Sequence, residues 1–176
     1  MKASPSVSII GAGNVGSRLA IAFHQANIKV DQICSKTLRH GKQLSRQVNA
    51  DFTQHIADLK AGSDVYFLCI PDQHFAKFRD AWELQDSLIV HTSGTTPIEI
   101  LDGISSSYGV FYPLQTFSRE HKLSFSNIPV CLEANRPEAL ELLKILARKI
   151  TANVSVLTSE QRRWAHLSSS PSQLYA

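Results

Sequence analysis

Three glycines near the start of the chain are spaced for binding phosphate groups. Gly11, Gly13 and Gly16 form the pattern G-x-G-x-x-G between an apolar run, residues 7–10, and a segment with helical apolar spacing, residues 15–26. The first glycine permits a tight turn, the second lets a pyrophosphate approach the backbone, and the third lets the helix pack closely on the strand. A helix that begins here would direct its N–H groups at the phosphates. The alternative is an ordinary glycine turn. We predict a dinucleotide site with cofactor contacts from Gly11, Gly13, Asn14, Val15 and Gly16.

The end of the second predicted strand indicates which dinucleotide would bind. A strand over residues 28–34 would finish beside the adenosine ribose, where NAD-selective proteins place Asp or Glu. Here the residues that follow are Ser35, Lys36 and Thr37, and then Arg39. They offer hydroxyls and cations to a 2′-phosphate and no carboxylate to repel it, so they favour NADP over NAD. The alternative is that Lys36 and Arg39 belong to a solvated helix start.

Later strand ends add candidate contacts, because parallel strands present their carboxyl ends to one crevice. Ile70 and Pro71 would wall the cofactor, and Thr92 would approach the nicotinamide or its ribose. His91 and Ser93 are the catalytic candidates: a histidine can relay a proton near neutral pH, and a serine hydroxyl can bind a carbonyl or carboxylate. The alternative for each is a hydrogen-bonded turn residue. The substrate-side candidates are Tyr112, Gln115 and Thr116.

Strand-like and helix-like segments alternate along the chain, which predicts the α/β class. We expect a Rossmann-like, doubly wound, mostly parallel sheet with helices on both faces. The continuously apolar run 65–70 is typical of a strand buried on both faces, and residues 136–150 show the spacing of an amphipathic helix. Thr96, Pro97 and Glu99 predict a helix start with a capping box.

Composition excludes several classes of function. A formal charge of +3 without a basic block gives no indication of nucleic-acid binding. No apolar run approaches the roughly 20 residues that a membrane span needs, and no signal-peptide core precedes the first strand. The three cysteines are widely spaced, so we expect reduced, mostly buried thiols in a cytoplasmic protein rather than a disulfide or metal set. Histidine spacing gives no metal site, and no G-x-S-x-G supports serine hydrolysis.

Five motifs together resemble one bacterial family. The order "IIGAGNVG … CIPD … HTSG … GVFYPLQTFS … SEQRRWAHL" is similar to that of predicted NADP-dependent oxidoreductases that join a Rossmann-like domain to a helical C-terminal domain of unassigned function. More distant relatives are pyrroline-5-carboxylate reductase, prephenate dehydrogenase and deazaflavin-dependent NADP reductase. The resemblance implies dinucleotide contacts at residues 11–16, 35–37 and 70–71, and it supports NADP without supplying a substrate.

The same resemblance implies a domain organisation. Residues 1–157 would form the NADP-binding domain, and residues 158–176 would begin a linker helix toward a C-terminal helical domain that is missing or truncated here. In relatives that domain dimerises and closes the substrate cleft, so we expect a homodimer where it is present. Its absence would leave the active site incomplete.

The expected function is that of an NADP-dependent oxidoreductase, which transfers hydride to or from an unidentified small molecule. The alternative is a non-catalytic NADP-binding sensor or assembly module, since the chain shows no catalytic Lys, Tyr or His in a recognised geometry.

Overall fold

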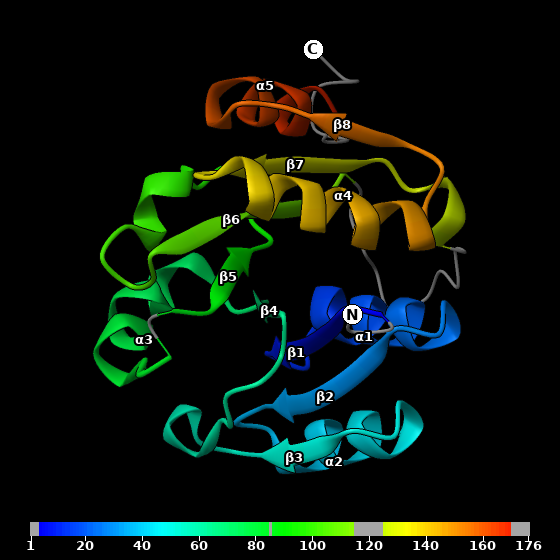
Figure 1. Ribbon diagram of the computed structural model, residues 1–176, viewed down its shortest axis with the longest axis vertical. Coiled ribbons are helices and arrows are strands. Elements are labelled where there is room, and N and C mark those ends of the chain that lie inside the picture. The colour runs from blue at the N-terminus through cyan, green and yellow to red at the C-terminus, as the bar shows by residue number, and fades with distance from the viewer. Residues whose placement is uncertain (1–3, 85, 115–124, 170–176) are drawn as a thin grey trace.

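The computed structural model describes residues 4–84, 86–114 and 125–169, which form one sheet with helices on both faces (Figure 1). The order of the strands in the described sheet is β3-β2-β1-β4-β5-β6-β7-β8, and neighbours run parallel except β6 and β7. This confirms the predicted Rossmann-like α/β class. The strands are β1 (Ser6–Ile10), β2 (Lys29–Cys34), β3 (Asp51–Thr53), β4 (Val65–Leu68), β5 (Leu88–His91), β6 (Ser107–Pro113), β7 (Val130–Ala134) and β8 (Val154–Val156).

Two hydrophobic clusters divide the helices between the faces of the sheet. One face packs against α1, α2 and α4, and the other packs against α3 and a short 3-10 turn at Ile98–Leu101. The helices are α1 (Asn14–Gln25), α2 (Leu38–Gln47), α3 (Phe75–Ala81), α4 (Pro137–Ile150) and α5 (Ser159–Ser169), and further 3-10 turns cover Ile56–Asp58, Asp72–His74 and Phe125–Asn127. In Figure 1, α5 lies beyond the β7–β8 end of the sheet.

Three phenylalanines fix α1 on the sheet. The ring of Phe23 in α1 lies 5.1 Å from that of Phe67 in β4 and 6.0 Å from that of Phe111 in β6, centroid to centroid. All three side chains are buried, and the pairs are tilted or edge-on, which aromatic quadrupoles favour. The orientation of α1, and so of its amino end, is therefore set by the core.

The connections around β1 create a crevice. The chain leaves β1 toward β2 on one side, while β4 occupies the other side of β1. Loops that leave β1 and β4 therefore diverge at the carboxyl edge, and such switch points are where ligands bind in open α/β sheets.

The predicted capping box is wrong. Residues 98–101 form only a 3-10 turn preceded by Pro97, and neither Thr96 nor Glu99 caps it: the N–H of Ile98 donates instead to the hydroxyl of Ser159. The Thr96 hydroxyl instead donates to the carboxylate of Asp72. A hydrogen bond to a carboxylate is stronger than one between neutral groups, so this contact holds Thr96 against Asp72 rather than at a helix start, and a turn of this length offers few free N–H groups.

The three cysteines are free, as predicted, with Cys34 and Cys131 buried and Cys69 partly buried. No helix in the described ranges is long and apolar enough to cross a membrane. Nor do the described residues include a group of three or more side chains arranged to hold a metal ion.

Candidate functional site

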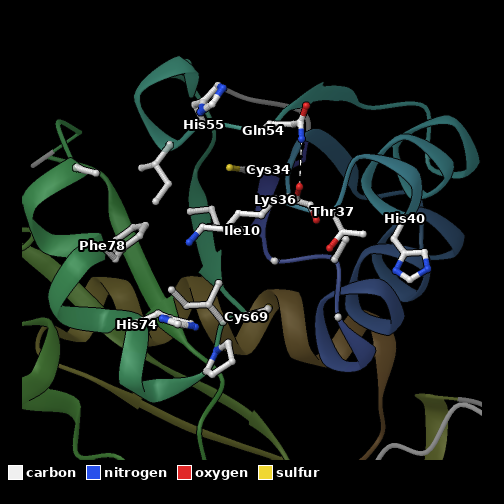
Figure 2. Close-up of a pocket in the computed structure, with 18 of the residues that line it drawn as sticks. Ile10, Cys34, Lys36, Thr37, His40, Gln54, His55, Cys69, His74 and Phe78 are labelled. Atoms are coloured by element: carbon white, nitrogen blue, oxygen red, sulfur yellow. Dashed lines mark hydrogen bonds between the residues drawn. The ribbon is translucent and has the colours of Figure 1, made fainter.

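A cavity of about 650 Å³ opens at the carboxyl ends of β1, β2 and β4. That volume lies within the usual range for small-molecule sites. Figure 2 shows Thr37 and His40 on one side of the cavity and His74 and Phe78 on the other. The residues that line it are Ile10–Gly13, Cys34–Thr37, His40, Gln54–Ala57, Cys69–Pro71, His74, Phe78 and Ala81.

The glycine turn packs with no room for side chains at two of its three glycines. Gly11 has a φ of +107°, and a Cβ there would lie 2.3 Å from the carbonyl oxygen of Cys69. A Cβ on Gly16 would lie 1.9 Å from the carbonyl oxygen of Gly11. At Gly13 a Cβ would meet nothing within 4 Å. The space beside Gly13 therefore belongs to the cavity, which is the arrangement that a close-approaching phosphate needs.

The amino end of α1 faces this space. Gly13 occupies the N-cap position, no side chain caps the helix, and its first turn contains no acidic residue. The positive end of the helix dipole is thus not offset by a carboxylate on the helix, which suits an anionic ligand. Asn14 does not line this cavity; with Gly13 it lines a smaller depression that is also bordered by residues of α1 and α2.

The loop after β2 supplies the cationic wall of the cavity. Ser35, Lys36 and Thr37, the predicted contacts of a 2′-phosphate, line the cavity, and the Lys36 carbonyl accepts a 3.1 Å hydrogen bond from Nε2 of Gln54. Arg39 does not line it: this side chain lies with Lys42 and others along the outer face of α2.

Acidic side chains are absent from the cavity lining in the described part of the chain. Asp31, the carboxylate of β2, lies within the strand and forms a 2.7 Å ion pair with Lys29. The lining instead carries Lys36 together with three histidines, His40, His55 and His74.

The opposite wall is apolar. Ile70 and Pro71, the predicted wall for a cofactor, line the cavity next to Cys69 and Phe78. Burial raises the pKa of the Cys69 thiol to about 12, so this thiol stays protonated near neutral pH. Cys69 therefore contributes apolar surface rather than a nucleophile.

His91 is completely buried and does not line the cavity. Its Nδ1 accepts a 3.1 Å hydrogen bond from the backbone N–H of Ser93. Burial, with a smaller effect of the Arg162 charge, lowers the pKa of His91 to about 4, so the ring is neutral near neutral pH. Its observed contact holds the loop after β5.

Ser93 belongs to a compact polar cluster with Asp72 and Thr96. Its hydroxyl lies 2.9 Å from Oδ2 of Asp72 and 3.0 Å from Oγ1 of Thr96, and it accepts hydrogen bonds from the N–H groups of Thr95 and Thr96. The cluster joins the loop after β5 to the loop after β4. Thr92 and Ser93 thus lie beside the cavity wall without lining it.

Tyr112 pairs with a residue from α5. Its hydroxyl lies 2.6 Å from Nδ1 of His166, and burial raises the pKa of Tyr112 to about 12. Gly94 packs between the two, since a Cβ there would lie 2.7 Å from each side chain. The other two substrate-side candidates, Gln115 and Thr116, lie outside the described residues.

Sequence reasoning missed two parts of this edge. Residues 54–57 line the cavity after β3, and the strand-end rule could have found them. The pair formed by buried Arg162 and partly buried Glu133 left no signal, because each is one charged residue within an otherwise ordinary helix or strand.

The chain is similar in sequence and fold to known oxidoreductases. Residues 6–94 match the family described as NADP oxidoreductase, coenzyme F420-dependent. A candidate NADP oxidoreductase from Bacteroides fragilis is 31% identical and superimposes with a TM-score of 0.91, covering 98% of this chain and 68% of that one. None of the curated proteins compared with the chain matches it.

Two more distant structures share the fold. Prephenate dehydrogenase from A. aeolicus, in complex with hydroxyphenyl propionate and NAD+, is 15% identical, with a TM-score of 0.77 over 91% of this chain and 62% of that one. Pyrroline-5-carboxylate reductase from Coxiella burnetii is 13% identical, with a TM-score of 0.71 over 89% and 60%. The chain thus spans less than two thirds of these two relatives.

Replacing glycines in the turn separates stability from ligand binding. We expect Gly16→Ala to lower the free energy of unfolding by several kcal/mol, about 2–4, because its methyl group would overlap the Gly11 carbonyl. Gly13→Ala meets no protein atom and should change stability by less than about 1 kcal/mol, yet it should abolish dinucleotide binding. Urea unfolding and ligand titration measure the two effects. Equal stability losses in both variants would contradict this geometry.

Burial of neutral His91 makes stability depend on pH. The unfolded chain binds a proton at this residue near pH 6.5, whereas the folded protein does so only near pH 4. The contribution of neutral His91 to the free energy of unfolding is therefore fully present above about pH 6.5. It is lost as the pH falls toward 4, by up to about 3 kcal/mol. Thermal unfolding between pH 7.5 and 4.5 should show a shallower decline in His91→Asn than in the native chain. Exposed His24→Asn should keep the native profile, and an unchanged profile in His91→Asn would refute the assignment.

Proposed function

Because the chain belongs to the family of coenzyme F420-dependent NADP oxidoreductases, we propose that it binds NADP in this cavity and transfers hydride between the cofactor and a small molecule. Membership of this family implies the general reaction class, that of a nicotinamide-dependent oxidoreductase. The choice of NADP is our inference. The observation that carries it is the cavity lining, which combines Lys36, hydroxyls and histidines with no carboxylate among the described residues.

The residues present fit the cofactor along the length of the cavity. Backbone at Gly11–Gly13 and the amino end of α1 would hold the pyrophosphate, since a Cβ at Gly13 would occupy open space. Ser35, Lys36 and Thr37 would hold the 2′-phosphate through a charge-assisted contact and hydroxyl groups. Ile70 and Pro71 would pack on the cofactor and exclude water.

The nicotinamide supplies the hydride chemistry when it is bound. The protein's part is to orient the reacting partners and handle one proton. In this proposal His91, neutral and buried, orients the backbone of Ser93 through its Nδ1. Thr92, Ser93 and Tyr112 would then border the substrate, with Gln115 and Thr116 as further candidates.

Nucleotide selectivity tests the assignment of the 2′-phosphate. Fluorescence titration should show that NADPH binds at least about tenfold more tightly than NADH, as expected for a charge-assisted contact. Lys36→Asp should remove that preference by repelling the phosphate. Lys42→Asp, an equal change of charge on the outer face of α2, should leave the preference intact. Equal affinities of the native chain for the two nucleotides would contradict the proposal.

Turnover separates an enzyme from a binding module. The chain should oxidise NADPH in the presence of at least one member of a panel of imines, keto acids and deazaflavins. Gly13→Ala serves as the control that cannot bind the cofactor. Tight NADPH binding without consumption across the panel would instead favour a non-catalytic sensor.

A further inference from the structure

Arg162 of α5 is fully buried, with a side chain that is 0% exposed. Its guanidinium pairs with the carboxylate of Glu133 in β7 and donates a 3.2 Å hydrogen bond to the Ser159 hydroxyl. Removing both charges from water carries a large desolvation cost, which a well-formed ion pair offsets only in part. The ion pair of a buried arginine therefore adds little net stability to the fold, so we looked at what else the Arg162 guanidinium contacts.

The additional contact of Arg162 is with the loop after β5. The guanidinium donates a 2.6 Å hydrogen bond to the carbonyl oxygen of Thr96. Ser159 reinforces the same attachment, since its hydroxyl accepts a 3.0 Å hydrogen bond from the N–H of Ile98. The amino end of α5 thus holds residues 96–98 from one side.

The same loop holds the wall of the cavity from its other side. The Thr96 hydroxyl donates to the Asp72 carboxylate, and the Ser93 hydroxyl lies 2.9 Å from the same oxygen. Asp72 directly follows Pro71, which lines the cavity, as does His74 just beyond it. A connected series of polar contacts therefore runs from Glu133 and Arg162 through Thr96 to the apolar wall.

A second contact brings α5 against this loop. Gly94 lies between Tyr112 and His166 of α5, with no room for a Cβ. His166 and Arg162 are four residues apart and so lie on one face of the helix. Residues 94–98 are thus held by α5 at two points.

We propose that Arg162 is a positioning residue for the nicotinamide end of the cofactor site: it orders the loop after β5, which through Thr96 and Asp72 fixes the wall at Ile70–Pro71. This inference rests on the proposed function, which places the cofactor against that wall, and it adds that the nicotinamide is the part of the cofactor in contact there. A ligand with the nicotinamide gains from a pre-ordered wall, whereas the adenosine and phosphate part contacts the glycine turn and residues 35–37.

Two ligands that differ only in the nicotinamide test this role. Thr96→Val removes the hydroxyl that reaches Asp72 and keeps the carbonyl that Arg162 contacts. We expect it to weaken NADP+ binding about tenfold, as for loss of a hydrogen bond to a charged group. Affinity for 2′-phospho-ADP-ribose should change by less than about twofold. Isothermal titration measures both affinities.

A double variant tests Arg162 itself. Arg162→Met alone would leave Glu133 uncompensated, so it is combined with Glu133→Gln, which removes both charges and keeps similar volumes. Like Thr96→Val, the double variant should lose affinity for NADP+ and keep its affinity for 2′-phospho-ADP-ribose. Thermal unfolding shows whether the double variant folds. If the double variant does not fold, the result for Thr96→Val alone tests the positioning role. Thr95→Val, on the exposed neighbour, is the matched control and should bind both ligands as the native chain does.

The outcomes are distinct. If the variants lost affinity for both ligands equally, or if Thr96→Val bound both as the native chain does, the contacts of Arg162 would only stabilise the fold. Either result would overturn the positioning role. Failure of the native chain to bind either ligand would overturn the proposed function, and this inference with it.

Discussion

The site depends on close backbone packing at the carboxyl end of β1. The Gly11 N–H donates to the Cys34 carbonyl at 2.8 Å, and the Cys69 N–H donates to the Ile10 carbonyl at 2.7 Å, so β2 and β4 are both tied to the first turn. Gly16 then brings α1 within contact of that turn. Since no side chain fits at Gly11 or Gly16, the backbone itself forms the floor of the cavity, and the amino end of α1 is held where an anion can reach it.

Charge and polarity divide the carboxyl edge of the sheet into two regions. The cavity over β1, β2 and β4 carries Lys36 and no acidic side chain among the described residues, a lining that favours an anionic ligand. The region over β5 and β6 is a network of short polar contacts centred on Asp72 and on the Tyr112–His166 pair. The first region suits binding of a phosphorylated ligand, and the second holds loops in place beside it.

Arg162 connects α5, the last described helix, to the polar network beside the cavity. Because a buried arginine without its partners would be costly, α5 can dock only where Glu133 and the Thr96 carbonyl are both in reach. The position of α5 and the shape of the loop after β5 are therefore coupled. Our proposal for Arg162, which lies 66 positions from Thr96 in sequence, depends on that coupling.

The alternation of strands and helices and the glycine turn could be predicted from the residues alone, because periodicity and glycine spacing are local signals. The strand-end rule likewise pointed to residues 35–37 and 70–71, which line the cavity. The sequence could not determine the surroundings of His91, the pairing of Tyr112 with His166 or the direction of Arg39, since each depends on segments distant in the chain. The predicted capping box at Thr96 failed for the same reason: the local pattern favoured a helix, but Thr96 contacts Asp72, twenty-four residues earlier, and the N–H of Ile98 donates to Ser159 of α5. Strand order placed His91 and Tyr112 in buried surroundings, and burial then lowers the pKa of His91 and raises that of Tyr112.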